Sequence, residues 1–454
     1  MQRIPNVLWP RATAAAIVVG GGALMLFVNL PGHLEFDSVR QLLEGRNGVY
    51  SNWHPPVMSW LLGLGDGIIP GAAAFVVFNV LLAFGTLLSV LWLVPRPGWL
   101  SVGAALICVA LPQLFLFPAI VWKDMLFAES CVAGFVLLAH AAMYWQCVRL
   151  RVVLLLGAVL LCALAALTRQ SGLLILPCAA AALGLIAGRV VGRKAGLAYG
   201  VGFLLACAGA TLGGNALLQL RASKALGAVE QIEDLQLYDM AGMLQRQPAL
   251  ELASLRRDAP ALEERMRNVG AKLYTPIGHD RLTDDPVIHG LIIGSVSAVG
   301  RQWQALILAH PWTYLQVRGE DFSWLFLSQH PSECLIYEVG VSGAPADLRA
   351  AHLSPRYDGR DQWLDEGYGQ RLIGTPALSH PAFALVGAIS LIAMLWRRRP
   401  ADLAFAGLMF ATLFYTLSFF VISIACQYRY LYAIDMSAIA AAFYLLTDWR
   451  PVER

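Results

Sequence analysis

The apolar run 152–167 (VVLLLGAVLLCALAAL) leads through the polar link Thr168-Arg169-Gln170-Ser171-Gly172 into a second apolar run, 173–188 (LLILPCAAAALGLIAG). An α-helix needs roughly 20 apolar residues to cross a hydrocarbon core of about 30 Å. Two such runs with a short polar link predict two antiparallel membrane helices that turn at the membrane surface. The hairpin therefore predicts an all-α polytopic membrane protein.

The composition of the whole chain agrees with this prediction. Of 454 residues, 58% are hydrophobic and 14% are charged, whereas a soluble domain carries about 25% charge. The formal net charge is only +3, which argues against a nucleic-acid partner and leaves membrane lipids as the main surroundings. Ten segments are apolar enough to span, near residues 12–30, 71–94, 101–120, 125–145, 152–168, 172–188, 196–219, 380–396, 403–424 and 432–448.

Basic residues predict the orientation of these spans, because cytoplasmic loops carry more Lys and Arg than outer loops. With the N-terminus in the cytoplasm, the inner loops contain Arg96, Arg149, Arg151, Arg189, Arg193, Lys194, Arg397, Arg398, Arg399, Arg450 and Arg454. The short outer loops hold only scattered basic residues. Both termini are therefore predicted to be cytoplasmic, and the first segment is predicted to be a retained anchor.

Three parts of the chain follow from this topology. Residues 1–220 form a transmembrane module whose first outer loop is 31–70, residues 221–379 form an outer-side, mainly helical soluble domain, and residues 380–454 form a C-terminal transmembrane module. The apolar stretch 290–309 is expected to be an interfacial or core helix, because a span there would place Arg301 in lipid. Cys334 and Cys426 are the two cysteines expected outside the membrane; they can pair, but spacing does not establish it.

The first outer loop holds the first cluster of polar residues. Asp37 begins a predicted short helix, and Glu35 lies two residues earlier, so the two carboxylates are expected to point in different directions. Asp37 fits either a general base or the N-cap of that helix. Further on, Pro55 and Pro56 fix the chain beside His54, which fits either a functional or a structural histidine.

Three further polar clusters lie at the outer ends of other spans. Lys123 and Asp124 open the fourth span, where they fit a phosphate ligand with a positioning acid, or an interfacial lysine beside a capping aspartate. The others are Arg169-Gln170, between the fifth and sixth spans, and Tyr428-Arg429-Tyr430, before the last. Arginine binds phosphate with a planar fork. Cations from three hairpins at one membrane face therefore favour an anionic lipid headgroup as ligand over separate interfacial contacts.

The predicted outer domain contains two further groups of polar residues. Asp239 lies alone in an apolar stretch, and the acidic and histidine residues between positions 279 and 289 are spaced as in a solvated loop rather than a metal site. No glycine-rich phosphate-binding motif and no nucleophile elbow is present. The sequence indicates no cofactor and no metal site, and it leaves a requirement for a divalent metal open.

In their order along the chain, these motifs resemble the GT-C superfamily of membrane glycosyltransferases, including bacterial relatives of protein mannosyltransferases and aminoarabinose transferases. The shared order is an acidic first outer loop, His54-Pro55-Pro56, Trp122-Lys123-Asp124, Thr168-Arg169-Gln170-Ser171-Gly172 and Arg429-Tyr430. The resemblance implies a catalytic carboxylate in the first outer loop, which corresponds to Asp37. It also implies a polyprenyl-phosphate-linked sugar as donor, with its phosphate held by Lys123, Arg169 and Arg429.

The resemblance thus implies an inverting glycosyltransferase of the bacterial inner (cytoplasmic) membrane, with its active site on the periplasmic side. The residues expected to position the substrates are Glu35, His54, Asp124, Gln170, Asp239, Tyr428 and Tyr430. The acceptor is a glycolipid, a surface polysaccharide or a protein. Two other functions stay open: a transporter or flippase for a lipid-linked saccharide, for which the chain shows no internal repeat, and an enzyme like an O-antigen ligase or polymerase.

Overall fold

The computed structural model describes residues 8–448 except 52, 221–226, 293–294 and 329–332. Within these ranges the chain forms helices joined by short links, with isolated β-bridges and no strand. The predicted all-α class is therefore confirmed. Arg450 and Arg454, which contributed to the predicted orientation, lie outside the described residues, as does the start of the predicted outer domain at 221.

Nine helices of the described part are long and apolar enough to cross a membrane. They are α1 (Leu8–Asn29), α4 (Ala73–Leu93), α7 (Lys123–Met143), α8 (Val148–Thr168), α9 (Ile175–Val191), α10 (Arg193–Gln219), α22 (His380–Arg397), α23 (Pro400–Ile422) and α24 (Tyr432–Thr447). The spans of α9 and α24 include the short turn before each helix and cover 170–191 and 428–447. They match nine of the ten predicted spans. The chain is a multi-pass membrane protein.

The remaining predicted span, 101–120, is broken rather than continuous. It consists of α5 (Leu100–Ala110), α6 (Pro112–Phe115) and the short turn η1 (Phe117–Ala119), with a bend of 68° after α5. Proline has no backbone N–H to donate and its ring clashes with the preceding turn. Pro112 and Pro118 therefore interrupt this segment, and the expectation of one straight helix is corrected.

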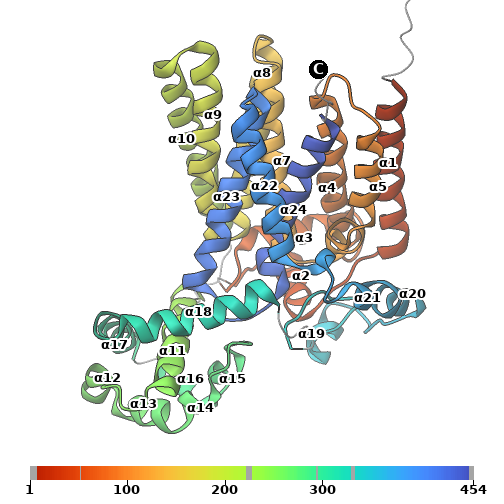
Figure 1. The fold of residues 1–454 in the computed structure, drawn as a ribbon. Coiled ribbons are helices and arrows are strands. Elements are labelled where there is room, and N and C mark those ends of the chain that lie inside the picture. Colours follow the sequence, from red (N-terminus) through yellow and green to blue (C-terminus); the bar gives the residue numbers. More distant parts are fainter. Residues whose placement is uncertain (1–7, 52, 221–226, 293–294, 329–332, 449–454) are drawn as a thin grey trace, which may run out of the picture.

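The positions of the helix ends fix how many times the described chain crosses the bundle. Figure 1 shows the start of α1 and the end of α24 at the same end of the bundle, which requires an even number of crossings. Nine continuous helices and the bent α5–α6–η1 segment make ten. The other apolar pair, α16 (Pro286–Ile292) and α17 (Val296–Ala309), lies with the helices outside the bundle, as expected for 290–309.

The helices of the bundle differ in how far they are enclosed. In α7, 94% of the 18-residue apolar stretch is buried inside the protein. The buried share is 78% in the last span and 28% in each of α1, α8 and α10. Helix α7 packs against α4, α8, α23 and α24. The two most enclosed spans therefore form the centre of the bundle, and the outer helices offer their apolar faces to lipid.

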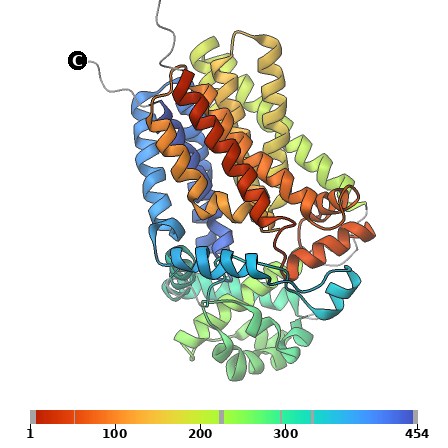
Figure 2. The same cartoon turned by 90° about the vertical axis from the view of Figure 1, so that its right-hand side faces the viewer.

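The segment 227–378 lies at the end of the bundle away from the chain termini (Figure 1; Figure 2, turned by 90°). Its first part has a core of its own, which includes Leu237, Val299 and Val317. The helices of this part are α11 (Gly227–Arg246), α12 (Ala253–Asp258), α13 (Pro260–Arg265), η3 (Met266–Gly270), α14 (Ala271–Leu273), α15 (Asp280–Thr283), α16, α17 and α18 (Pro311–Leu327).

The second part of this segment packs differently, because its buried residues belong to the core of the bundle. Ile336, Val341 and Leu364 are examples. This part contains α19 (Pro345–Ala350), α20 (Gly359–Gln362), η4 (Trp363–Gly369), α21 (Gln370–Leu372) and η5 (Pro376–Leu378). The predicted outer part thus contains two units. The first is a helical unit with its own core (227–327), and the second, called the strap here (333–378), packs directly on the bundle.

A buried charge cluster joins the helical unit to the bundle. Arg318 of α18 pairs with Asp239 and lies 3.8 Å from Asp321, and it donates to the carbonyl of Ser423 at the end of α23. Trp303 also donates to Asp239, at 2.7 Å. Asp239 is therefore engaged inside this unit, and two carboxylates share one arginine. Burial raises the pKa of Asp239 to about 6 and that of Asp321 to about 7, against the opposing charge of Arg318.

These pKa shifts predict that the protein loses stability as the pH rises. Both carboxyls have a folded-state pKa above the unfolded value of about 3.9, so their contribution is fully present below that value and is lost as the pH passes through about 6 to 7. We expect Asp321→Asn, which imitates the protonated acid, to flatten this dependence. Thermal unfolding in detergent at pH 5 and pH 8 measures it.

Asp284 is exposed, so Asp284→Asn serves as the matched control. Its thermal unfolding should depend on pH as that of the wild type does. If Asp321→Asn unfolds with the same pH dependence as the wild type, the linkage resides in other groups.

Candidate active site

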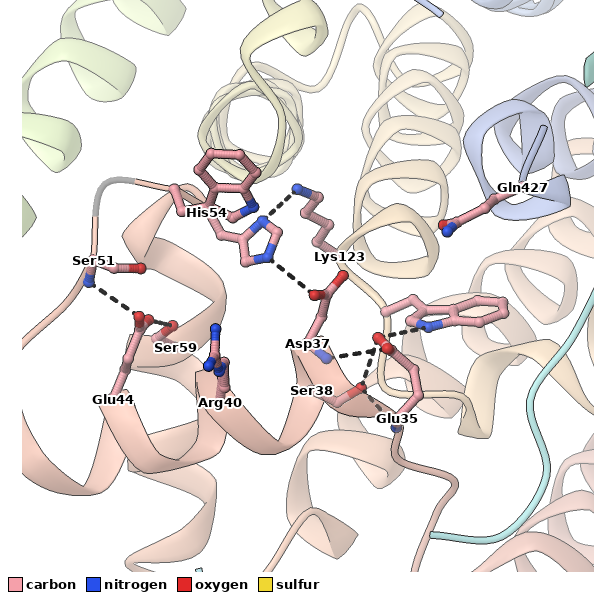
Figure 3. Close-up of polar contacts among 12 residues, drawn as sticks. Glu35, Asp37, Ser38, Arg40, Glu44, Ser51, His54, Ser59, Lys123 and Gln427 are labelled. Carbon is pink, nitrogen blue, oxygen red and sulfur yellow. Dashed lines mark hydrogen bonds and ion pairs between the residues drawn. The ribbon is translucent and has the colours of Figure 1, made fainter. Parts of the chain in front are cut away.

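The polar residues predicted at the helix ends lie where the helical unit and the strap meet the bundle. Four segments supply them: the first loop, the N-terminal end of α7, the link between α8 and α9, and the link between α23 and α24 that contains η6 (Tyr428–Leu431). Figure 3 shows Asp37 and His54 of the first loop and Lys123 of α7 turned toward one another. These residues are far apart in sequence and come together only through the packing of the bundle.

The first loop begins with an acidic cap on the helix α2 (Phe36–Asn47). Glu35 has extended backbone, its side chain accepts from the N–H of Asp37 at 3.0 Å, and its own N–H donates to the hydroxyl of Ser38. This reciprocal pattern is a capping box. The N-cap is therefore Glu35, so the alternative that made Asp37 the N-cap is wrong, and Asp37 is left with its side chain available for other contacts.

Both carboxylates of the loop reach the same guanidinium. Arg429 lies 3.3 Å from an oxygen of Glu35 and 3.0 Å from an oxygen of Asp37. The expectation that the two acids would point in different directions rested on a regular element. It is wrong because Glu35 precedes the helix with extended backbone, while Asp37 lies in the first turn.

The second half of the loop holds His54 against this pair. Helix α3 (Pro56–Asp66) starts at the prolines and packs on α2 with backbone in contact, since a Cβ at Gly45 would lie 2.6 Å from the nitrogen of Gly63. This close packing brings the imidazole of His54 to Asp37.

The histidine links Asp37 to a lysine on α7. His54 Nε2 lies 3.5 Å from Asp37, and its Nδ1 lies 2.9 Å from the ammonium of Lys123 (Figure 3). Because an ammonium can only donate, Nδ1 accepts and the ring proton is assigned to Nε2, which faces the carboxylate. Burial and the nearby charge of Lys123 lower the pKa of His54 to about 4, so the imidazole is neutral at pH 7.

Lys123 differs from the other cations of the site. Among the ion pairs of the described residues, none joins its ammonium to a carboxylate, and its recorded partner is the neutral ring of His54. A partly buried ammonium is stabilised by a nearby anion. The geometry at Lys123 is therefore suited to an anionic ligand.

Asp124 holds the two arginines on the other side of the site. It pairs with Arg169 from the link between α8 and α9, and Arg429 lies 3.9 Å from its second oxygen. The guanidinium of Arg169 lies over the ring of Tyr430 at 5.1 Å, and that of Arg429 lies 5.0 Å from the ring of Trp122. Cation–π contacts of this kind orient a guanidinium without neutralising its charge.

The three carboxylates differ in exposure and in pKa. The side chain of Asp37 is 28% exposed, against 13% for Glu35 and 2% for Asp124. Burial raises the pKa of Glu35, and Arg429 opposes the shift. Burial also acts upward on Asp37, but contact with His54 and the charges of Arg429 and Lys123 outweigh it and hold the pKa of Asp37 below its usual range. Asp37 is thus the ionised and most accessible acid.

Other predicted site residues lie beside or outside this cluster. Tyr428 points into the bundle, where its hydroxyl donates to Asp435 at 2.6 Å, and Gln170 is exposed and bonded to Gln231 of α11. Asp239 belongs to the charge cluster of the helical unit described above. The structure thus brings Glu35, Asp37, His54, Lys123, Asp124, Arg169, Arg429 and Tyr430 together and leaves Gln170, Asp239 and Tyr428 out.

Sequence reasoning assigned no role to two residues that complete the cluster. Trp122 donates to Glu35 at 3.3 Å, besides its contact with Arg429. Gln427 accepts from the Nε of Arg429 at 2.7 Å. Both are direct neighbours of predicted residues, and that adjacency is the only signal the sequence offers for them.

Comparisons with known proteins found similarity only among solved structures. No protein-family model matches the chain, and no curated protein sequence does. Among solved structures, the chain is similar to the oligosaccharyltransferase AglB of Archaeoglobus fulgidus (14% identity, TM-score 0.42, 95% of this chain and 50% of that chain covered). It is also similar to the arabinosyltransferase EmbB of Mycobacterium smegmatis (15% identity, TM-score 0.35, 94% and 42% covered).

One of these proteins is an oligosaccharyltransferase and the other an arabinosyltransferase. The chain spans about half the length of these proteins or less. At such identities and TM-scores the similarity assigns no substrate and no residue role, so the chemistry of this chain rests on its own contacts.

The contacts of Arg429 predict that its removal destabilises the protein. Arg429→Met leaves Glu35 and Asp37 beside each other without their shared cation, and breaking such a pair costs about 3–5 kcal/mol when it is fully buried. Since Asp37 is partly exposed, we expect roughly 3 kcal/mol, measured as a lower thermal unfolding temperature in detergent. Adding Glu35→Gln to this variant should restore part of the loss.

Arg40→Met is the matched control, because Arg40 is exposed and its ion pair with Asp347 lies at the surface; its effect should stay within about 0.5 kcal/mol. Equal unfolding temperatures for the Arg429 and Arg40 variants would contradict the bridging role of Arg429.

Proposed function

We propose that this protein is an inverting glycosyltransferase that takes a sugar from a polyprenyl-phosphate carrier and transfers it to an acceptor hydroxyl. The observation that supports it is the meeting of one accessible, ionised carboxylate with three cations at one end of a membrane bundle. Asp37 lies in contact with His54 and Arg429, and Lys123 lies on the other side of His54. Carboxylate and cations are the groups that this transfer requires.

The donor phosphate is proposed to bind at Lys123, with Arg169 and Arg429 next to it. Among the described residues, the ammonium of Lys123 forms no ion pair with a carboxylate. The guanidiniums of Arg169 and Arg429 are held in fixed orientation by Asp124 and by aromatic rings. Fixed cations stabilise the charge that develops on a departing phosphate without reorganising during the reaction. The polyprenyl chain would lie in the lipid beside these helices, since the site is at the end of the bundle.

In the proposed step, the acceptor oxygen attacks the anomeric carbon of the donor sugar from the face opposite the phosphate. The new bond joins acceptor oxygen and anomeric carbon while the bond from that carbon to the phosphate oxygen breaks. The bonding electrons leave with the polyprenyl phosphate, and the hydroxyl proton passes to Asp37. A single displacement of this kind inverts the configuration at the anomeric carbon, and the enzyme supplies a base, positioning and charge stabilisation.

We expect donor binding to raise the pKa of Asp37 and so to make it a stronger base. In the free protein, contact with His54 and the neighbouring cations hold the pKa of Asp37 low, which makes it a weak base. A phosphate at Lys123 adds negative charge near Asp37 and draws on the same cations, and both effects raise its pKa. Asp37 thus becomes a stronger base when the donor is in place.

The location is proposed to be the bacterial inner membrane, with the active site on the periplasmic side. Basic residues gather in the loops at the end of the bundle that carries the termini. At the opposite end, Cys334 and Cys426 form a disulfide next to the site. Disulfides persist in oxidising compartments and are rare in the cytosol, so the site end fits the periplasm.

Asp37→Asn tests the proposed base. General-base catalysis contributes about 10²–10⁴-fold to a rate, so we expect kcat to fall by that factor while the protein still inserts in the membrane and binds donor. The assay incubates the purified full chain with a labelled polyprenyl-phosphate monosaccharide and a mixture of envelope glycolipids and polysaccharides. Asp284→Asn, an exposed aspartate, is the control.

Retained transfer by Asp37→Asn would remove Asp37 from the role of base. A wild-type protein that works only on a diphosphate-linked oligosaccharide would instead be a ligase or polymerase. One that moves the intact donor across liposomes without cleaving it would be a transporter.

Lys123→Met tests the phosphate site separately. A lost hydrogen bond to a charged group costs about 1.5–3 kcal/mol, so the KM for donor should rise roughly 10- to 100-fold, with a smaller change in the KM for acceptor. Lys272→Met, at an exposed position of α14, is the control with the same change in side chain. An equal rise in both KM values would count against a phosphate at Lys123.

A further inference from the structure

A cavity of about 440 Å³ lies within the strap. Small-molecule sites usually measure about 300–1,000 Å³. Its lining comes from the strap alone, with residues from three parts of it: Tyr337, Glu338, Val339, Val341, Ser342, Pro355, Arg356, Tyr357 and Asp365. None of these residues belongs to the predicted site.

Backbone hydrogen bonds attach the wall of this cavity to the first loop. The N–H of Leu34 donates to Gly340, and the N–H of Ser342 donates back to Leu34, both at 2.9 Å. Leu34 is the residue before Glu35. At the other end of the same stretch, the N–H of Tyr428 donates to the carbonyl of Leu335 at 3.0 Å, and Tyr428 is the residue before Arg429. The stretch 335–342 therefore runs between the two segments that carry the site.

A buried histidine fixes this stretch in place. The N–H of Gly340 donates to Nδ1 of His33 at 2.9 Å, and the other ring nitrogen lies 3.0 Å from Asn29 at the end of α1. Burial and the charge of Arg356 lower the pKa of His33 to about 3, so the ring stays neutral and Nδ1 stays an acceptor. The cavity wall is thus attached to the bundle and does not depend on a ligand for its position.

The charges of the candidate site also affect a carboxylate of the cavity wall. Burial raises the pKa of Glu338 in the cavity wall, and the charge of Glu35 adds to this rise while Arg429 opposes it. Charges separated by far more than a Debye length of about 10 Å would be largely screened. Glu338 in the cavity wall is therefore near enough to Glu35 and Arg429 to be influenced by their charges.

The lining offers carboxylate oxygens and tyrosine rings in a small space. Asp365 accepts from the hydroxyls of Tyr337 and Tyr357, both at 2.9 Å, and Glu338 accepts from Ser342 at 2.9 Å. Hydroxyls of a sugar donate well to carboxylates, and the apolar C–H face of a sugar ring packs on an aromatic ring. Tyr357 is 54% exposed, so its ring is accessible.

The charges disfavour an anionic ligand. Two carboxylates line the cavity, and its arginine is already engaged, since Arg356 pairs with Asp361 at 2.9 Å and donates to the carbonyl of Gly32. A phosphate would meet repulsion here and find its cations at Lys123 instead. The cavity and the donor site are therefore suited to different partners, one neutral and rich in hydroxyls, the other anionic.

We propose that this cavity binds the acceptor, and that the acceptor is a carbohydrate presenting a neutral sugar ring, rather than a polypeptide. The proposal rests on the proposed function, since it names the acceptor of that transfer. Tyr357 packs on the sugar ring, Asp365 and Glu338 accept from its hydroxyls, and the sugar is placed so that one hydroxyl faces Asp37. Asp365, Glu338 and Tyr357 are positioning residues and do not take part in bond breaking.

Binding without donor tests the acceptor site independently of transfer. The full chain in detergent is mixed with neutral hexose and pentose oligosaccharides, and with a serine-rich peptide, and saturation-transfer NMR reports which of them contacts the protein. We expect the oligosaccharides, and not the peptide, to bind to the wild type. Tyr357→Ala and Asp365→Asn should weaken binding about 10-fold or more, and Tyr357→Phe, which keeps the ring, should weaken it less.

Tyr144→Ala is the control, an exposed tyrosine at the other end of the bundle, and should leave binding unchanged. The proposal would be overturned if the peptide bound and the saccharides did not. It would also be overturned if Tyr357→Ala and Asp365→Asn bound saccharides as well as the wild type does. Absence of transfer with intact, cavity-dependent saccharide binding would instead reject the proposed transfer reaction and leave the binding site standing.

Discussion

The site depends on charge balance around Arg429. Its guanidinium contacts Glu35 and Asp37 of the first loop and lies 3.9 Å from Asp124 at the start of α7. Each of these charges, taken alone, would be costly at the end of a membrane helix. Together they hold segments from the beginning, the middle and the end of the chain in one arrangement. The polar groups that fit the proposed chemistry are the same groups that hold these segments together.

Much of the surrounding structure serves to keep Arg429 in position. Tyr428 binds Asp435 inside the bundle, and His380 lies 2.9 Å from the other oxygen of that carboxylate. On the outer side, the disulfide from Cys426 and the bond from Arg318 to Ser423 hold the same link between α23 and α24. The link is thus fastened from within the bundle, from the strap and from the helical unit. A guanidinium on a freely moving loop could not orient two acids.

Several features were predictable because they depend on local pattern. Long apolar runs with short polar links predicted ten spans, of which nine are continuous helices, since the need to satisfy the backbone in lipid leaves a helix as the simplest solution. The polar residues at the ends of these helices were also predictable, because charge in the middle of a span is expensive. The break at Pro112 was missed because the apolar pattern continues through it. The joint contact of Glu35 and Asp37 with Arg429 was missed because it depends on the extended backbone at Glu35.

From its residues alone, the chain could be assigned to membrane proteins, its helices placed to within a few residues, and its polar ends named, because hydropathy and charge are properties of short segments. Tertiary structure alone decided which of these polar ends meet. It joined Asp37 to His54, Lys123 and Arg429, left Asp239 in a separate core, and placed the strap cavity beside Glu35. Such contacts join residues tens to hundreds of positions apart, and they follow from helix packing and charge pairing that no local pattern records.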